Sequence, residues 1–228
     1  MKLPFPLSRI LASLAESAAA DMGLAMAIAI VDHEGLLQYF ARMEGALPAS
    51  TEIAISKAYT AAALRMSTRE VGQMALPGHP LYGIQHTHAG KIVLFGGGFP
   101  LKLRGQVAGG IGISGGSVEE DERVAMAVLD TLGEVECLAE SIKPLLRGKP
   151  QGTNWMSYLE RCLEKAFLKE GCFITHEFIS ILAGAFIIAS DDNELMSIDS
   201  SHWEWDNDED RGGKEKRFAD KGPIGQWL

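Results

Sequence analysis

Apolar and polar positions near the start of the chain predict one helix followed by a β-hairpin. Apolar residues recur at helical spacing between positions 8 and 23, with Ser8 as the expected N-cap and Gly23 as the expected end. Apolar, β-branched runs at 25–31 and 36–43 then flank the turn residues 32–35. Two such runs around a short polar turn predict antiparallel strands.

The next part of the chain predicts two helices. The first is expected to begin at Ser50 and is rich in alanine. Four of its alanines would form a face small enough to press closely onto a sheet: Ala54, Ala58, Ala61 and Ala62. Ser67 and Glu70 form a Ser-x-x-Glu capping box, which predicts a short helix to about Met74.

A glycine-rich stretch, 90–116, follows and predicts two more strands. Residues 92–95 and 107–113 are apolar, and Gly96, Gly97 and Gly98 lie between them. Glycines in a strand context mark bulges or the close approach of another backbone or a ligand. The capping box Ser117–Glu120 then starts a long helix, expected from Val118 to about Ile142.

This order of elements predicts the α+β class, with an antiparallel sheet of about five strands flanked by helices. We expect one domain at 1–148. Residues 149–228 differ in character, because they contain all four tryptophans and an acidic run after position 203. We expect a C-terminal extension there, partly helical and then acidic and flexible. Its acidic run is either a solvated tail or a docking segment for a protein partner.

Composition narrows the class of protein. The chain is 46% hydrophobic and 22% charged, as in globular proteins, and its net charge of −9 argues against nucleic acid and anionic membranes as partners. Three cysteines without a Cys-x-x-Cys motif indicate neither a disulfide framework nor a zinc site. We see no targeting segment, and the apolar run at 178–189 is too short to span a bilayer, so we expect a cytoplasmic protein.

Several stretches together resemble the GlcG/HbpS family, also called the PduO C-terminal domain family. The first half is similar over 27–62, and the second half over 96–101 and 105–125. The positions that carry the resemblance in the first half are Val31, Asp32, Glu34, Gly35, 42–46, Ser50, Ile53, Ala54, Lys57, Ala58, Thr60 and Ala61. Leu81–Gln85 points to the PduO-like branch. The resemblance covers about 8–140 and does not extend to 149–228.

The resemblance implies a profilin-like fold, a homo-oligomer and binding of haem, with members found in cobalamin-dependent or bacterial microcompartment metabolism. Haem needs an axial ligand and cations for its propionates. The candidate ligands are His33, His79, His86 and His88; the first helix, which carries the ligand in some members, has no histidine here. His86 and His88 would share a face of an extended chain, and such spacing serves a metal, for which we select His86.

Arg42 and Lys57 lie at motif positions of the family and are candidate partners of an anionic group. The alternative for both residues is a salt bridge with Glu44, Glu52 or Asp121. Gly97 and Gly98 offer backbone N–H groups to an anion, or else they permit a bulge or tight packing.

The sequence therefore predicts a small-ligand binding or sensing protein whose ligand is haem or a related tetrapyrrole. No nucleophile elbow, His-Glu-x-x-His motif or dinucleotide fingerprint is present. One alternative is an auxiliary enzyme acting on a small acid, aldehyde or corrinoid, with Lys57 and a histidine as its polar groups. The other is a structural assembly subunit.

Overall fold

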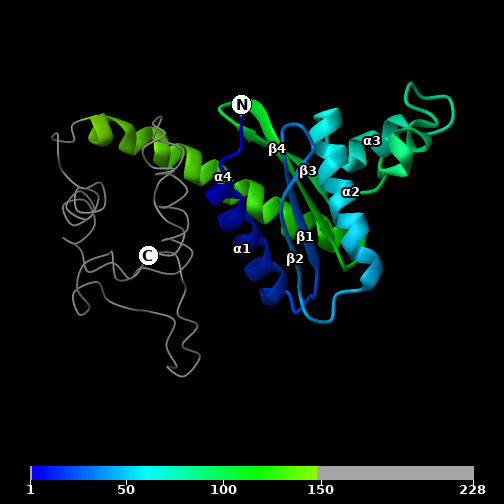
Figure 1. Ribbon diagram of the computed structural model, residues 1–228, viewed down its shortest axis with the longest axis horizontal. Helices are drawn as coiled ribbons and strands as arrows, with labels where there is room; N and C mark the ends of the chain where they lie inside the picture. The colour runs from blue at the N-terminus through cyan, green and yellow to red at the C-terminus, as the bar shows by residue number, and fades with distance from the viewer. Residues whose placement is uncertain (1, 148–228) are drawn as a thin grey trace. The chain divides into compact units, whose positions relative to one another are not determined.

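A computed structural model describes residues 2–147, which form an antiparallel sheet with helices on both faces (Figure 1). The elements in chain order are α1 (Phe5–Asp21), β1 (Ala27–Asp32), β2 (Leu37–Arg42), α2 (Pro48–Leu64), α3 (Thr68–Met74), the 3-10 turns η1 (Ile84–His86) and η2 (His88–Gly90), β3 (Gly98–Leu103), β4 (Gln106–Ser114) and α4 (Val118–Arg147). The α+β class and the expected order are confirmed, with four strands in the described residues where about five were expected. The predicted extension, 149–228, lies outside the described residues.

The chain divides into two compact units, 1–133 and 134–228. The first contains the sheet, α1 to α3 and the first turns of α4, and it is the unit discussed below. Of the second, residues 134–147 are described, and they continue α4. Within 2–147 no helix is both long and apolar enough to cross a membrane.

The sheet consists of two hairpins joined through their inner strands. Its order is β2-β1-β4-β3, so that β1 and β4 are central. The hairpin β1–β2 was predicted and is confirmed. The hairpin β3–β4 turns at Arg104 and Gly105, both with positive φ (51° and 75°), as two-residue hairpin turns require.

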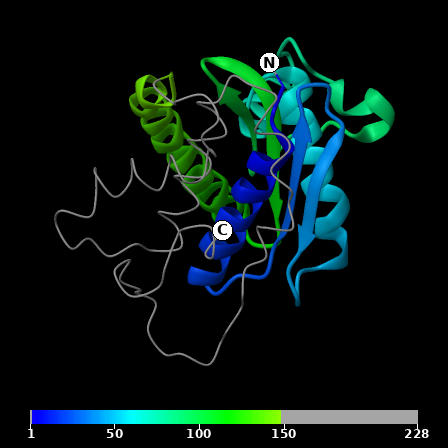
Figure 2. The same ribbon diagram turned by 60° about the vertical axis from the view of Figure 1, so that its left-hand side comes forward.

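Helix α2 covers one face of the sheet, and α1 with the first turns of α4 covers the other (Figure 2). The α2 face is made of small residues: Ala27, Ala29 and Val31 of β1 pack against Ala54, Ala58 and Ala62. In β4, Gly110 and Gly112 lie directly under the helix, where an added Cβ would meet the carbonyl oxygens of Ala58 and Ala54. The alanine face of this helix is therefore confirmed, and the glycines of β4 allow the two backbones to touch.

The opposite face carries the larger apolar residues. Ile28 and Ile30 of β1 lie opposite Ile113 and Ile111 of β4, and all four are fully buried. Because side chains alternate along a strand, these isoleucines must point away from α2. The asymmetry between the two faces therefore follows from the alternation of small and large residues in β1 and β4.

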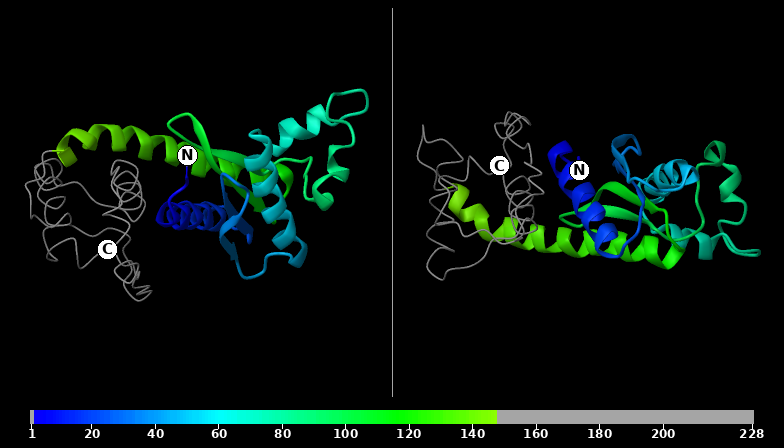
Figure 3. Two further views of the ribbon diagram at one scale, coloured as in Figure 1. Left: turned by 45° about the horizontal axis from the view of Figure 1, so that its top comes forward. Right: turned by 90° about the horizontal axis from the view of Figure 1, so that it is seen from below.

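The prediction of a strand at 92–95 is wrong. Strand β3 begins instead at Gly98 and includes Pro100. Backbone groups of 91–93 are used elsewhere, because the hydroxyl of Thr60 in α2 accepts the N–H of Val93 at 3.0 Å. The single hydrogen of that hydroxyl faces the carbonyls of Ser56, at 2.7 Å, and Lys91, at 3.1 Å. Since β3 is an edge strand, it tolerates a proline, which has no N–H for a sheet ladder. The segment 75–97 lies beside α2 as a long connection (Figure 3).

Two helix starts were also predicted wrongly. Helix α1 begins at Phe5 after Pro4, and α2 begins with Pro48 after Leu47, so neither Ser8 nor Ser50 is an N-cap. Proline suits the first turn of a helix because its fixed φ is helical and its missing N–H is not needed there. The capping boxes at Ser67–Glu70 and Ser117–Glu120 are both present.

Candidate functional site

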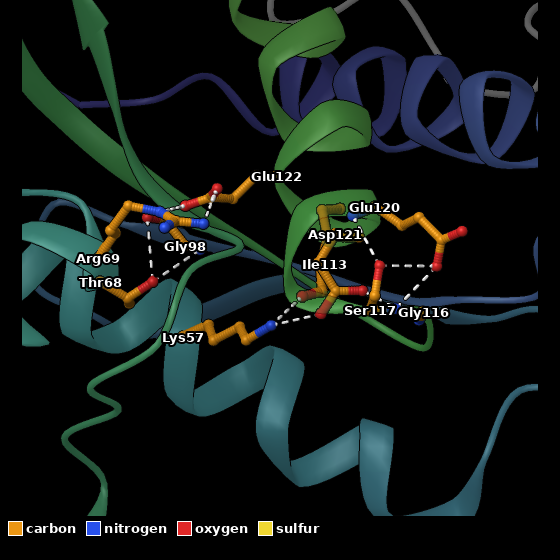
Figure 4. Close-up of polar contacts among 10 residues, drawn as sticks. All are labelled: Lys57, Thr68, Arg69, Gly98, Ile113, Gly116, Ser117, Glu120, Asp121 and Glu122. Carbon is orange, nitrogen blue, oxygen red and sulfur yellow. Dashed lines mark hydrogen bonds and ion pairs between the residues drawn. The ribbon is translucent and has the colours of Figure 1, made fainter.

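Lys57 of α2 carries its charge into the interior of the protein. Its side chain is fully buried and ends between β4 and the first turn of α4 (Figure 4). The Nζ atom donates to Oδ2 of Asp121 at 2.6 Å and to the carbonyl oxygen of Ile113 at 2.8 Å. It also lies 5.0 Å from the centre of the Phe95 ring, a cation–π distance. These contacts surround the ammonium group.

Burial disfavours the charged form of both partners in this pair. It lowers the pKa of Lys57 and raises the pKa of Asp121, while the hydrogen bond between them acts in the opposite direction on each. Asp121 also accepts the N–H of Gly116 through Oδ1, at 3.1 Å. The hydrogen bonds of the pair therefore join α2, β4 and α4. Of the three acids considered as salt-bridge partners of Lys57, Asp121 is the one that forms the bridge.

The predicted glycines lie against this pair. A Cβ on Gly97 would come within 2.6 Å of the Lys57 Nζ and 2.8 Å of the Asp121 Cβ. The N–H of Gly98 donates to the hydroxyl of Thr68 at 3.0 Å. These contacts favour tight packing over anion binding, because the space beside the glycines is filled and the Gly98 donor is used.

An ion pair between Arg69 and Glu122 lies on the solvent side of the same region. Arg69 donates to both carboxylate oxygens of Glu122, at 2.6 and 2.5 Å, in the bidentate form typical of arginine. An added Cβ on Gly96 would meet the side chain of Glu122. The region is thus a polar junction between α3, α4 and the three glycines at 96–98. Lys57 is fully buried and uses two of its three N–H donors within this junction, so an anionic ligand would reach it only if the junction opened.

Arg42 is placed apart from this junction. It is exposed at the end of β2, where Nη1 donates to the carbonyl of Ala46 at 2.9 Å. No contact among the described residues joins it to Lys57. The structure therefore brings together Lys57, Gly97 and Gly98 of the predicted site residues, and leaves Arg42 and the histidines elsewhere.

The three candidate histidines between α3 and β3 are all exposed. His86 ends η1 and His88 begins η2, so the chain is turned here, and the face that they would share in an extended chain does not form. Within 2–147, no three His, Cys, Asp or Glu side chains are close enough to hold a metal ion together. The choice of His86 as a metal ligand stays a prediction.

Two residues that the sequence did not single out lie beside His88. The ring of Tyr59, on the outer side of α2, is 6.1 Å from the imidazole of His88, with an angle of 56° between the planes. The Nζ atom of Lys91 is 5.7 Å from the centre of the same Tyr59 ring. Tyr59 follows Lys57 by two positions, and no sequence signal connects it with residue 88. This surface combines an imidazole, an aromatic ring and a cation.

Comparisons with known proteins cover the same part of the chain. A family model described as haem degrading protein HbpS-like matches residues 6–130. An uncharacterised 15.0 kDa protein of Citrobacter freundii, from the dhaT-dhaS intergenic region, is 40% identical over 125 residues, which are 55% of this chain and 88% of that protein. The corrinoid adenosyltransferase PduO of Citrobacter freundii is 41% identical over 125 residues, 55% of this chain but 37% of PduO.

A solved structure shares the fold. The crystal structure of a PduOC–haem complex is 38% identical and superimposes with a TM-score of 0.55, over 57% of this chain and 94% of the other. The chain therefore spans nearly all of that fragment and about a third of the length of PduO.

Proposed function

The chain belongs to the HbpS-like family of haem-degrading proteins, and from this premise we propose that it binds haem or a related tetrapyrrole. The observation that carries the proposal is the likeness to the PduOC–haem complex, which is 38% identical over 94% of its length. The fold is shared, so a ligand bound by that protein is the first one to test here.

The residues of this structure suit such a group. Haem needs a neutral nitrogen or similar donor for its iron, an apolar or aromatic surface and cations for its propionates. His88, Tyr59 and Lys91 offer these three kinds of group on one surface. Bound haem would supply an iron centre capable of ligand and electron chemistry; the protein's part would be to hold and orient it.

We expect purified protein to bind hemin at a fixed ratio. In a titration followed by visible absorbance, a sharp Soret band should rise and reach a plateau at one haem per subunit or per pair of subunits. The same hemin in buffer without protein gives the spectrum of the free compound. A broad band that keeps growing without a plateau would contradict haem binding and direct the search to corrinoids and small acids.

The proposal extends to the pathway and the assembly. Relatives that are corrinoid adenosyltransferases support a role in cobalamin-dependent metabolism. The family resemblance in the sequence adds a bacterial microcompartment as the place of that role. Large apolar side chains at the surface support the expected homo-oligomer: Phe5, Leu36, Leu37, Leu47, Leu76, Tyr82, Phe95 and Met126. A docking role for the acidic run after position 203 stays a prediction.

A further inference from the structure

The hydrogen bonds of the three candidate histidines in the segment 75–97 differ, and the difference bears on which of these three can ligate iron. The ring of His79 has no hydrogen-bond partner among residues 2–147. The Nε2 atom of His86 lies 3.3 Å from the amide nitrogen of Gln85. The Nδ1 atom of His88 lies 2.8 Å from the hydroxyl oxygen of Thr87.

The contacts of Thr87 fix the tautomer of His88. The Thr87 hydroxyl oxygen is also 2.6 Å from the carbonyl oxygen of Ile84. Two oxygens this close repel each other unless a hydrogen lies between them, and a hydroxyl has one hydrogen. That hydrogen is therefore given to Ile84, and the contact with His88 is made by a proton on Nδ1. In the neutral imidazole, the Nε2 atom of His88 then carries the free lone pair.

This arrangement is the one that protein ligands of metals use. A histidine that binds a metal through one nitrogen usually donates its other N–H to an oxygen, which fixes the ring and its tautomer. His86 has a longer contact, because its Nε2 lies 3.3 Å from the side-chain amide of Gln85, which can present either its nitrogen or its oxygen and whose oxygen is buried without a partner. His79 has no group among residues 2–147 that orients it. Of the three, His88 has the shortest ring contact, 2.8 Å, and its partner is a hydroxyl oxygen that is itself bound to Ile84.

The surroundings of His88 are held in place by α2. Thr60 accepts the N–H of Val93, which ties the end of the segment 75–97 to α2, the helix that carries Tyr59. The backbone at His88 has a φ of 51°, followed by Ala89 at 53°. Such left-handed residues are sparsely populated and persist where the surrounding structure holds them. His88, Tyr59 and Lys91 are thus positioned by backbone as well as by side chains.

We propose that His88 is the axial ligand of the haem iron through Nε2, that Thr87 positions its ring, and that Tyr59 and Lys91 receive the macrocycle and a propionate. This inference rests on the proposed binding of haem. It selects His88 over His79 and over His86, which the sequence favoured as a metal ligand.

The decisive variant is His88→Gly, because glycine adopts a positive φ without strain whereas most other residues do not. With the full-length protein and hemin, we expect His88→Gly to lose the sharp Soret band and free imidazole to restore it. His79→Ala and His86→Ala are the matched controls and should keep the wild-type spectrum. Thr87→Val should weaken hemin binding about 10- to 100-fold, the range for partners of a metal-binding histidine.

The tautomer has a test that needs no haem. In apo protein labelled with ¹⁵N, the ring nitrogens of His88 should show a protonated Nδ1 and a bare Nε2, and Thr87→Val should mix the two tautomers. A saturable Soret band that survives in His88→Gly, or that disappears in a control instead, overturns the assignment to His88 but leaves haem binding intact. The absence of a saturable band in the wild-type protein overturns both.

Discussion

Lys57 and Asp121 bring opposite charges into a region with little water, and this decides what each contributes. Removing two ions from water costs several kcal/mol each, and their attraction offsets that cost only when hydrogen bonds complete the pair. Here Ile113 and Gly116 supply those bonds. The pair therefore joins α2 to α4 specifically, with a modest net contribution to the free energy of unfolding.

We expect Lys57→Met to destabilise the protein by about 3–5 kcal/mol, because it leaves the carboxylate of Asp121 buried and unpaired. The double variant Lys57→Met with Asp121→Leu should recover much of that loss, since neither charge remains. Urea denaturation of the wild type, both single variants and the double variant measures the coupling. A single Lys57→Met variant within about 1 kcal/mol of the wild type would show that the pair is not buried as described.

Single residues also show where sequence reasoning about the site stops. The sequence identified the histidines and Lys57 by residue type and motif position. It left open whether Lys57 pairs with Glu44, Glu52 or Asp121, because the partner depends on which part of the chain packs next to α2 in the folded protein. It did not find Tyr59, whose relation to His88 exists only after the segment 75–97 folds against α2. Contacts between distant positions leave no periodic signal in a sequence.

At the scale of elements, helix α2 and strand β4 define how the layers meet. The helix presents alanines and the strand presents glycines, so the two backbones approach more closely than larger side chains would permit. Each small residue alone would lower stability through lost burial. Together these small residues bring Lys57 within hydrogen-bond distance of Ile113 and Asp121. A larger separation between α2 and β4 would prevent both contacts.

Gly112→Ala should destabilise the protein by about 1–3 kcal/mol or more, because its Cβ would enter the space of the Ala54 carbonyl. Gly133→Ala is the matched control, since it lies in α4 with no atom within 4 Å of an added Cβ. The control should be neutral or stabilise by up to about 1 kcal/mol through helix propensity. Thermal unfolding of both variants distinguishes them, and equal effects would refute the close approach.

The elements that the sequence predicted well are those specified locally. The hairpin β1–β2, the alanine face of α2 and the capping boxes depend on neighbouring residues, and all are present. The prediction of a strand at 92–95 failed because the hydroxyl of Thr60 in α2 accepts the N–H of Val93, a donor that a strand would use in its ladder. The helix starts failed because proline, placed just before each serine, begins the helix earlier.

At the scale of the whole molecule, the part of the chain that the family model matches is little more than half of it. The family model covers residues 6–130, and the 15.0 kDa relative consists almost entirely of this stretch. The family match ends at residue 130 and the first compact unit ends at residue 133. A domain at 1–148, with residues 149–228 as an addition to it, stays a prediction.

A chain that ends at Gly148 should therefore unfold in one cooperative transition and bind hemin with the ratio and spectrum of the full-length protein. Calorimetry and the hemin titration, each run beside the intact chain, test this. Aggregation or a broad, non-cooperative transition would show that residues 149–228 belong to the fold. A normal transition with altered hemin binding would instead assign the extension a part in the site.

The sheet order also determines when the interior can form. Each hairpin joins residues close in the chain, whereas β1 and β4 bring Ala27 opposite Ser114. Closing so long a loop loses entropy before any contact compensates for it, so we expect the hairpins to form early and their union late. The surface that receives α2 is made by both central strands and does not exist before they meet. Until then, both hairpins present unpaired edges, and the nascent chain is most exposed to aggregation during that interval.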